Sequence, residues 1–532
     1  MKPLIICLLN IFLHLACYSQ KFNYEIIDEA NYSLNDNITP AQHGFLYYEL
    51  EANRKVSYAG IGLNKLRLGV KINKLDTSLK LIDSKYLLNG ENKLLPFLYD
   101  FFKFNSNHCL VYQDTKNDEM LGNVKLMTID EATLGVKSET VLLNFEKFKI
   151  SFETKDVVKK EITTFSTRVS PNEKMLLTMC ELPTEEGDRK KIYFTVFDNN
   201  LKMVMEKKIS FKDDVVVIDS YTCDDNGNVY IGYLGTVEAE GKLKKGEVID
   251  VGKKIMIIKP ESKDPIILPF KLPGYTINYY DFIHSTAQNK IFIIGLYTRG
   301  WDDNHLGVFN TSIDLANMTL SKIEKTDFSA ELVKKFDDDG YANSKEKKFG
   351  LARNFSPTYV TRGDGSVDLI LSYSRLDNSS SISSTGVLRS GNTTFYAGNI
   401  LDAHLINNHL VFSRVPRDIS SLNTNFYTSF TTFSKDENLV LLYNENESNI
   451  EDDINKKSRP AVVQKSEICA TTISSDGKVK RELLLKGYKS KTIGLLTRIY
   501  YISPNSFFIL LQKLNFASMS TKDTKYAKIT VE

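Results

Sequence analysis

One short stretch combines several side chains that could bind a ligand. Residues 299–305 read R-G-W-D-D-N-H and contain the chain's single tryptophan. Trp301 could stack on a sugar ring or another flat ligand, while the carboxylates of Asp302 and Asp303 accept hydrogen bonds from its hydroxyl groups. His305 could join them, although the spacing matches no recognised metal motif. The simpler interpretation is a polar loop capped by one aromatic side chain.

Two aspartate-rich stretches resemble calcium loops in composition. They are residues 224–228 (D-D-N-G-N) and 337–340 (D-D-D-G), and neither has the alternating D-x-D-x-D-G spacing with a distal glutamate. We interpret both as turns. The sequence also lacks the G-x-S-x-G, H-E-x-x-H and G-x-x-x-x-G-K-[ST] motifs. We therefore predict no metal, no cofactor and no catalytic residue. Enzyme activity stays open, because carboxylates from separate segments can converge in a fold.

A repeated strand–turn–strand unit organises the chain. Residues 221–233 (Y-T-C-D-D-N-G-N-V-Y-I-G-Y) are the clearest copy, because Asn-Gly supplies the positive φ angles of a tight hairpin. The second strand of the unit recurs at spacings of 54 to 76 residues, starting at Phe45, Cys109, Met175, Val229, Ile291, Val367, Leu439 and Phe507. Such a period is typical of β-propeller blades with decorated loops. We predict an all-β fold in which residues 20–532 form a single β-propeller of about eight four-stranded blades, with seven as the alternative.

The turns of each unit divide the ring into two faces. Short polar turns precede the second strand and follow the third, whereas the remaining connections are longer. Connections alternate between the two ends of a meander, so both tight turns share one face and the long connections share the other. The long connections are residues 51–67, 235–252, 298–306, 374–394, 444–463 and 515–525. Because repeat proteins usually bind through their elaborated face, we add Tyr58, Arg375 and Arg389 to the candidate site.

Two further segments fit this ring. Phe328, Leu332 and Phe336 share one side of a short helix predicted in the connection between the fifth and sixth units. The last unit lacks one strand, and residues 22–28 alternate like an unpaired strand at the other end of the chain. Pairing the N-terminal strand with the last blade would close the ring and remove two exposed sheet edges.

The N-terminus predicts export. Lys2 precedes the apolar run 4–16, which is too short to anchor the chain across a bilayer. We interpret residues 1–19 as a cleaved secretory signal peptide. The alternative is a lipoprotein signal in which Cys17 carries a lipid anchor. No later segment is apolar enough to be a transmembrane span, so we expect a periplasmic or extracellular protein.

The composition of the chain limits the classes of partner that the protein could bind. The formal net charge is +2, with acidic and basic residues interspersed, which argues against a nucleic-acid binder. Four cysteines follow the leader, with no C-x-x-C spacing, and their disulfide status is open: Cys109, Cys180, Cys223 and Cys469. Three of them, all but Cys223, lie in apolar runs, which is typical of small buried side chains.

Three stretches of the C-terminal part occur in a characteristic order. They are residues 353–373 (R-N-F-S-P-T-Y-V-T-R-G-D-G-S-V-D-L-I-L-S-Y), 439–449 (L-V-L-L-Y-N-E-N-E-S-N) and 474–484 (S-S-D-G-K-V-K-R-E-L-L). Together with the eight-unit pattern they resemble a family of uncharacterised secreted proteins from Bacteroidota, mainly over residues 320–532. Ser372 stands near a position where that family tends to have an acidic residue. The resemblance implies export and a propeller-like fold, and it supplies no catalytic residues.

These observations predict a non-catalytic, ligand- or protein-binding propeller of the cell envelope. Its partner would be an unknown envelope protein or a glycan, bound through the face of the long loops. The alternative is a hydrolase that acts on glycans or peptides at the mouth of the central channel. A glycoside hydrolase would need two carboxylates there, roughly 5 to 9.5 Å apart.

Overall fold

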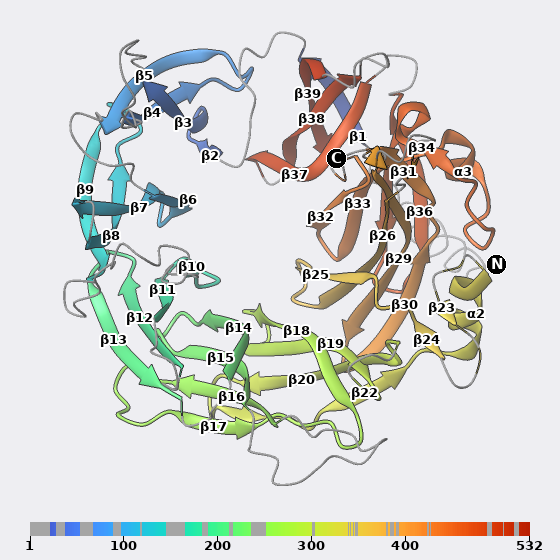
Figure 1. Cartoon of the computed structure of the whole chain (residues 1–532), viewed down its shortest axis with the longest axis horizontal. Coiled ribbons are helices and arrows are strands. Elements are labelled where there is room, and N and C mark those ends of the chain that lie inside the picture. Colours follow the sequence, from blue (N-terminus) through green and yellow to red (C-terminus); the bar gives the residue numbers. More distant parts are fainter. Residues whose placement is uncertain are drawn as a thin grey trace, which may run out of the picture.

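A computed structural model describes most of the chain. The described residues are 22–27, 38–53, 67–88, 97–117, 120–144, 165–182, 190–211, 216–235, 252–300, 304–338, 340, 342–343, 345, 349–378, 381–382, 388–389, 393–422, 425, 427–486, 492–503, 505–514 and 521–531. Within them the chain folds into antiparallel sheets arranged in a ring (Figure 1). The prediction of an all-β propeller with eight four-stranded blades is confirmed.

The first four blades are regular meanders, with strands in sequence order from the axis of the ring outward. Blade 1 contains β2 (Ile38–Ala41), β3 (Gly44–Asn53), β4 (Arg67–Leu75) and β5 (Leu81–Leu88). Blade 2 contains β6 (Phe97–Phe104), β7 (Asn107–Asn117), β8 (Met120–Ile129) and β9 (Val136–Leu143). Blade 3 contains β10 (Phe165–Val169), β11 (Met175–Leu182), β12 (Lys191–Asp198) and β13 (Met203–Ser210). Blade 4 contains β14 (Val216–Cys223), β15 (Val229–Gly235), β16 (Gly252–Ile258) and β17 (Ile266–Pro269).

Of the other four blades, two have extra strands and two have four strands each. Blade 5 contains β18 (Thr276–Ser285), β19 (Lys290–Thr298), β20 (Gly307–Asp314) and two short outer strands, β21 (Thr319–Leu320) and β22 (Glu324–Asp327). Blade 6 contains β25 (Phe355–Thr361), β26 (Val367–Asn378), β29 (Thr393–Ile406) and β30 (His409–Val415), with β31 (Ile419–Leu422) and β34 (Ala461–Val462) added. Blade 7 contains β32 (Phe430–Lys435), β33 (Asn438–Glu445), β35 (Glu467–Ile473) and β36 (Val479–Leu485). Blade 8 contains β37 (Thr492–Ser503), β38 (Ser506–Leu514), β39 (Thr521–Val531) and β1 (Phe22–Ile27).

The remaining elements belong to the connections. Helix α2 (Ala330–Asp338) lies between blades 5 and 6, followed by the paired β23 (Ala342–Asn343) and β24 (Gly350–Leu351). The predicted helix is therefore confirmed, and Phe328 and Phe336 are buried. The short pair β27 (Ser381–Ile382) and β28 (Leu388–Arg389) extends the connection within blade 6. Helix α3 (Glu447–Glu451) and the 3-10 helix η3 (Val463–Lys465) lie in the connection within blade 7.

The ring closes through its N-terminal strand, as predicted. Strand β1 pairs antiparallel with β39, from Phe22 opposite Val531 to Ile27 opposite Tyr526. The last blade thereby combines three C-terminal strands with one N-terminal strand. This pairing gives β39, which otherwise would be an edge, a complete set of neighbours.

Aspartate side chains shape the hairpin turns. In the turn between the third and fourth strands of blade 1, Asp76 Oδ1 accepts hydrogen bonds from the backbone N–H groups of Ser78 and Lys80. In the equivalent turn of blade 3, Asp198 Oδ1 accepts from the backbone N–H groups of Asn200 and Lys202. The D-D-N-G-N stretch is also a turn. Asp224 accepts from backbone N–H groups at 226 and 228 and from the Tyr230 hydroxyl, while Gly227 has a φ of +79°.

The hydrophobic core is divided into clusters between adjacent blades. Within β26, Leu369 and Leu371 pack toward blade 5, whereas Ile370 packs toward blade 7. Both faces of the strand are buried, so its sequence reads as a nearly continuous apolar run. Each of the eight blade-to-blade junctions has such a cluster. The four described cysteines lie buried in these clusters as free thiols.

A buried ionic cluster joins blades 6 and 7 near their tight turns. Arg362 donates from Nε and Nη2 to both carboxylate oxygens of Asp368 at 2.8 and 2.7 Å, and from Nη1 to the backbone oxygens of Glu437 and Ile473 in blade 7. Burial opposes ionisation, but hydrogen bonds from His404 and Arg362 lower the pKa of Asp368. Burial, and then the charge of Asp368, raise the pKa of Asp402 beside them. One guanidinium thus lies beside two buried carboxyl groups, whose pKa values are shifted in opposite directions.

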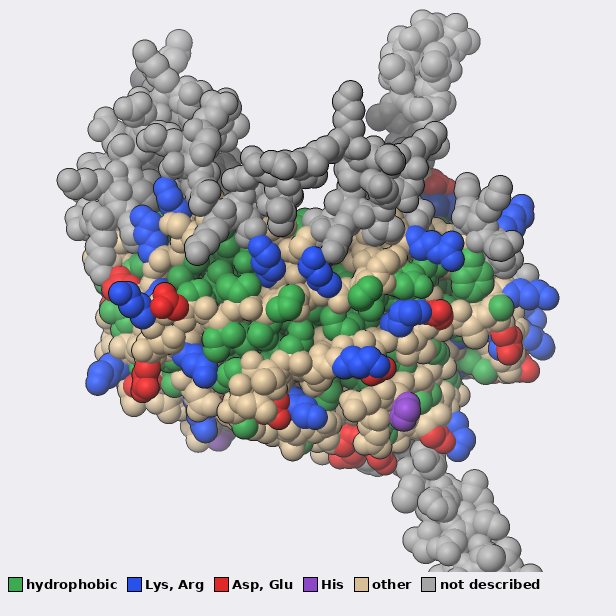
Figure 2. Space-filling model, turned by 90° about the horizontal axis from the view of Figure 1, so that it is seen from below, with side chains coloured by type: hydrophobic (Ala, Val, Ile, Leu, Met, Phe, Trp, Pro, Cys, Tyr) green, Lys and Arg blue, Asp and Glu red, His purple; other side chains and the backbone are tan. Residues whose placement is uncertain are grey.

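The outer wall of the ring is partly apolar. Figure 2 shows a band of hydrophobic side chains across the middle of the wall, interspersed with Lys and Arg. Outer strands contribute exposed residues such as Met203, Val204 and Ile267. Charged side chains on such edge strands disfavour edge-to-edge association. In the described part of the chain no helix is long and apolar enough to cross a membrane.

Ring closure leads to a stability prediction. Removing residues 20–28 from the mature chain should lower the free energy of unfolding, on the order of 3 kcal/mol, because six backbone pairs and the contacts of Phe22 with the blade 7–8 core are lost. Urea unfolding followed by tryptophan fluorescence and circular dichroism measures the change. A truncated chain as stable as the full one would show that β1 contributes nothing to closure.

The buried cluster leads to a second prediction. Arg362→Met should destabilise the fold by about 3 to 5 kcal/mol, because the buried Asp368 loses its cation. The control is Lys322→Met, which removes an exposed ion pair with Glu324 and should cost about 0 to 1 kcal/mol. Equal losses in the two variants would contradict the role of burial. Denaturant unfolding of both proteins at neutral pH provides the comparison.

Candidate functional site

The connection within blade 6 is a structured arm. Residues 374–394 were expected to form a long loose connection, but β26 and β29 continue as a pair past a bulge at Ser372/Ser374, until Asn378 opposes Thr393. The segment T-T-F-Y-A at 393–397 consists largely of strand-forming residues, which explains the extension. The connection is therefore a β-hairpin built on the long-loop face.

Two further strands brace the arm. After β30 the chain passes Pro416, the Arg417 N–H donates to Asn399 Oδ1, and β31 then pairs with β29 further along, Ile419 opposite Ala397. Strand β34 adds a parallel pair to β31. We call these four paired segments, residues 374–378, 393–397, 419–422 and 461–462, the arm sheet. The part of its inner face that lies nearest the blade is buried, because Ala397, Ile419 and Ala461 pack with Tyr427, Val463 and Ile493, whereas Leu376 further along the same face is 50% exposed.

The outer face of the arm sheet is exposed and mixed in character. The guanidinium of Arg375 lies 4.7 Å from the ring centroid of Tyr396, its cross-strand partner, and its Nη2 lies 2.9 Å from Asp377 Oδ2. The Arg375 and Asp377 side chains are 48% and 49% exposed. Leu422 and Val462 are exposed on the same face, at 36% and 44%. A stacked cation, an aromatic ring and aliphatic groups thus form one rigid surface.

A buried carboxyl group anchors the neighbouring connection within blade 7. Glu445 Oε1 accepts hydrogen bonds from the N–H of Asn446 at 2.7 Å and from Asn449 Nδ2 at 2.9 Å, while Oε2 has no partner. Asn449 also exchanges hydrogen bonds with the backbone of Arg459. Burial raises the pKa of Glu445 to about 7, although hydrogen bonds and the charges of Arg417 and Arg481 oppose the rise. This carboxyl group holds α3 and the following loop in place.

Polar groups on the inner strands join blades 4 and 5. Asp219 Oδ2 accepts hydrogen bonds from Lys253 Nζ at 2.8 Å and from the Tyr280 hydroxyl at 3.1 Å. Burial lowers the pKa of Lys253, an effect opposed by Asp219, and burial raises the pKa of Tyr280. A Cβ at Gly232 would lie 2.3 Å from the Tyr280 hydroxyl oxygen, so the tyrosine requires glycine there.

A second aspartate of the inner wall is also paired. Asp281 accepts hydrogen bonds from the Ser220 hydroxyl of blade 4 and from the N–H of Phe282. Asp100 in blade 2 repeats this arrangement, with Thr167 of blade 3 and the N–H of Phe101 as donors. Both aspartates lie in a Y-D-F triplet, at 99–101 and 280–282. The sequence interpretation missed these residues, and the repeated triplet was the signal that could have revealed them.

The structure describes only some of the predicted site residues. Tyr58, Trp301, Asp302 and Asp303 lie outside the described residues. His305 is buried, its ring nitrogens have no hydrogen-bond partner, and its ring stands edge-on to the exposed Tyr279 at 6.0 Å. Burial lowers the pKa of His305 to about 4. Its backbone pairs with that of Leu351 in an isolated antiparallel bridge.

Two predicted residues lie on the arm. Arg375 belongs to the exposed face of the arm sheet, and Arg389 lies in β28, opposite Ser381. No hydrogen bond or ring contact of the described residues joins His305 to the arm sheet. The ligand site that combines all seven residues stays a prediction. Within the described ranges, no three His, Cys, Asp or Glu side chains converge in a way that would hold a metal ion.

Comparisons with known proteins show low similarity only. No protein-family model matches the chain, and no curated protein matches it. Among solved structures, the propeller domain of the Trilobed protease from Pyrococcus furiosus is 11% identical, with a TM-score of 0.33, and the match covers 85% of this chain and 95% of that one. An ulvan lyase bound to a sugar is 9% identical, with a TM-score of 0.36 and coverages of 80% and 90%. A protein of unknown function from Dyadobacter fermentans is 10% identical, with a TM-score of 0.29 and coverages of 69% and 94%.

The buried Glu445 predicts a specific pH dependence. Its pKa is about 7 in the folded state against 4.5 for the ordinary group, so between these values the folded protein binds more protons than the unfolded chain. The contribution of Glu445 to the free energy of unfolding should therefore fall by about 3 kcal/mol as the pH rises through this window. Glu445→Gln should remove that part of the dependence.

Urea unfolding at several pH values between about 5 and 8 tests this expectation. The matched control is Glu451→Gln, which makes the same substitution at an exposed position of α3. Histidines and other titrating groups affect all three proteins alike, so the difference curves isolate Glu445. Parallel curves for the wild type and Glu445→Gln would contradict the raised pKa.

Proposed function

We propose that this protein is an exported, non-catalytic binding propeller of the cell envelope. It engages a protein partner through the face that carries the long connections, with the arm sheet as the central contact. The predicted leader at residues 1–19 supports export, with acylation of Cys17 as the alternative form. The loop with Trp301, Asp302, Asp303 and His305, together with Tyr58 and Arg389, belongs to the same face by chain topology and would extend the contact.

The observation that carries this proposal is the exposed outer face of the arm sheet. A hairpin that leaves a propeller blade adds no core of its own, yet here two extra strands and a partly buried inner face hold it rigid. Tyr and Arg are enriched where proteins bind one another, and the Arg375–Tyr396 stack is flanked by Leu422 and Val462. A preorganised surface of this composition loses little conformational entropy when a partner docks.

The inner wall supports a binding role over catalysis. Asp219 and Asp281, like Asp100 in blade 2, are carboxylates of the inner strands that a hydrolase could use. Each already has partners within the chain, Asp219 in a buried contact with Lys253 and Asp281 with Ser220 and a backbone N–H. Such pairs link adjacent blades and leave the carboxylates less available to act as an acid or a base. Hydrolysis of a glycan or a peptide is the alternative function.

A comparative capture experiment tests the proposal. The mature wild-type chain, a Tyr396→Ala/Leu422→Ala variant and a Tyr86→Ala variant are immobilised and exposed to envelope extracts of the source cells. Tyr86 is a matched control, because it forms a similar cation–ring contact with Lys71 on the outer wall of blade 1. We expect a partner that the wild type and the control retain equally and that the arm variant binds about tenfold more weakly.

Two outcomes would overturn the proposal. Equal capture by the arm variant and the wild type would remove the arm sheet from the contact. Release of sugars or peptides by the wild type, abolished in Asp281→Asn, would replace binding with hydrolysis as the function. Capture profiles on a glycan array, with Trp301→Ala as the variant, separate a glycan ligand from a protein partner.

A further inference from the structure

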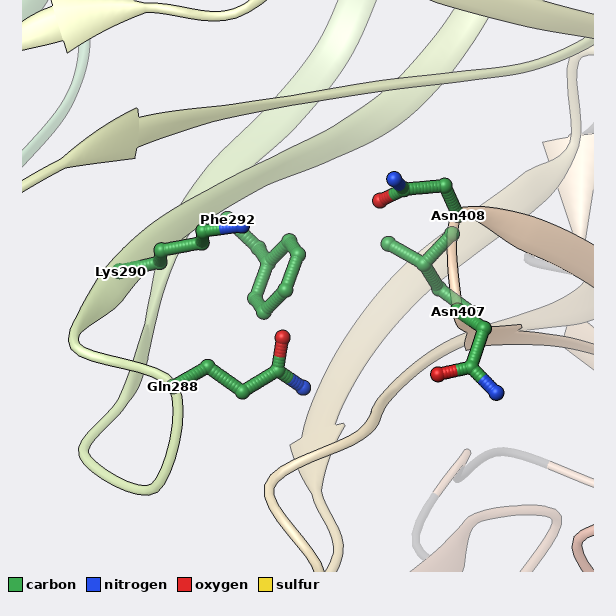
Figure 3. A pocket seen from close by; sticks show the side chains of 6 residues that line it. Gln288, Lys290, Phe292, Asn407 and Asn408 are labelled. Carbon is green, nitrogen blue, oxygen red and sulfur yellow. The ribbon is translucent and has the colours of Figure 1, made fainter.

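A pocket lies between blades 5 and 6 on the tight-turn face, opposite the arm sheet. It has a volume of about 310 Å³ and is lined by Gln288, Lys290, Phe292, Leu405, Asn407 and Asn408. The first three belong to the hairpin between β18 and β19, and the others to the hairpin between β29 and β30. Figure 3 shows the side chains of Gln288 and Asn407 facing one another across the gap, with the ring of Phe292 beside them.

The pocket occupies a seam that is bridged by hydrogen bonds at three other junctions. In blades 1 and 2, the Gln42 N–H donates to the carboxylate of Glu131 at 2.9 and 3.1 Å. In blades 2 and 3, Asn105 Nδ2 donates to the backbone oxygen of Asn199 at 3.1 Å. In blades 6 and 7, Arg362 reaches the backbone oxygen of Ile473. Each bond joins the first hairpin turn of one blade to the second hairpin of the next.

Between blades 5 and 6, Ser285 Oγ donates to the backbone oxygen of Gly365 at 2.9 Å, but no hydrogen bond of the described residues joins the first hairpin turn of blade 5 to the second hairpin of blade 6. Both turns are fully described, and no hydrogen bond links residues 286–290 to residues 406–409. The side chains of Gln288, Lys290, Asn407 and Asn408 make no hydrogen bond or ion pair with the rest of the described chain. These four polar side chains therefore face solvent and are available to a ligand.

We propose that this pocket binds an acidic sugar residue. Three carboxamides both donate and accept hydrogen bonds, which matches the hydroxyl groups of a sugar. The ammonium of Lys290 can pair with a carboxylate, and no acidic side chain lines the pocket to compete for it. Phe292 and Leu405 are only 6% and 3% exposed, so the polar side chains supply most of the surface that a sugar would contact. The volume lies at the lower end of ligand pockets and suits a single ring.

This binding site is independent of the proposed protein contact. It lies on the opposite face of the ring and shares no residue with the arm sheet. The Tyr396→Ala/Leu422→Ala variant should therefore bind the sugar as the wild type does. If the wild type binds its protein partner but no sugar, this inference fails while the proposed function stands. If it binds the sugar but captures no protein partner, the proposed function fails while this inference stands.

Calorimetric titration of the full mature chain with glucuronate, glucose and acetate tests the inference. We expect weak binding of glucuronate, with a dissociation constant on the order of 1 mM, weaker binding of glucose and none of acetate. Lys290→Gln should lower the affinity for glucuronate about tenfold, to that for glucose, because the pair with the carboxylate is lost. Asn408→Gly should weaken both sugars, and glycine keeps the turn intact because Asn408 has a φ of +64°.

The matched control is Lys174→Gln. Lys174 precedes the second strand of blade 3 just as Lys290 begins that of blade 5, and this substitution should leave the affinity for glucuronate unchanged. Equal losses in the two lysine variants would assign the effect to overall charge and overturn the site. Equal binding of acetate and glucuronate would show an anion site without sugar recognition, and would also overturn the proposal. Thermal melting curves confirm that each variant is folded.

Discussion

The burial of both faces of each blade requires a neighbour on each side. Strand β26 shows the requirement, because Leu369 and Leu371 are covered by blade 5 while Ile370 is covered by blade 7. An open array would leave one such face exposed at each end, so the fold depends on the antiparallel pairing of β1 with β39. Closure brings Phe508 and Tyr526 of blade 8 against Phe45 and Tyr47 of blade 1. The core is thus continuous around the ring, and each junction resembles its neighbours.

This constraint explains which parts of the fold the sequence predicted. Second strands such as 439–442 are buried on both faces, so they read as apolar runs at a regular spacing, and turns such as 224–228 carry residues with local hydrogen-bonding roles. These features depend on neighbours in the chain. The arm sheet depends instead on contacts between distant segments, because β31 pairs with β29 only after the chain has passed Pro416. The polar residues of the arm sheet also resemble those of a loop. Only Arg375 of its exposed face was among the predicted site residues.

The polar contacts between blades were also beyond sequence reasoning. Asp219 and Tyr280, or Arg362 and Glu437, are more than sixty residues apart, and no local pattern shows that they meet. For His305, the local sequence was misleading. An imidazole beside two aspartates suggested an exposed ligand group, but the backbone pair with Leu351 places the ring in a buried, unpaired position. Burial of this kind is set by tertiary packing, and burial in turn decides the pKa of the group.

Departures from the repeat concentrate on blades 5 and 6. The outer strand of blade 5 is divided into β21 and β22, and α2 follows, with Phe336 packed against Phe355 of blade 6. Blade 6 carries the arm sheet on one face, and its junction with blade 5 holds the pocket on the other. A repeat that serves only the core has no physical reason to vary at one junction, since every junction buries the same kind of surface. At this seam Ser285 Oγ donates to the backbone oxygen of Gly365, but the first hairpin turn of blade 5 has no hydrogen bond to the second hairpin of blade 6. The strands added on the other face bury a small apolar cluster of their own, so both changes depart from the regular repeat at the same pair of blades.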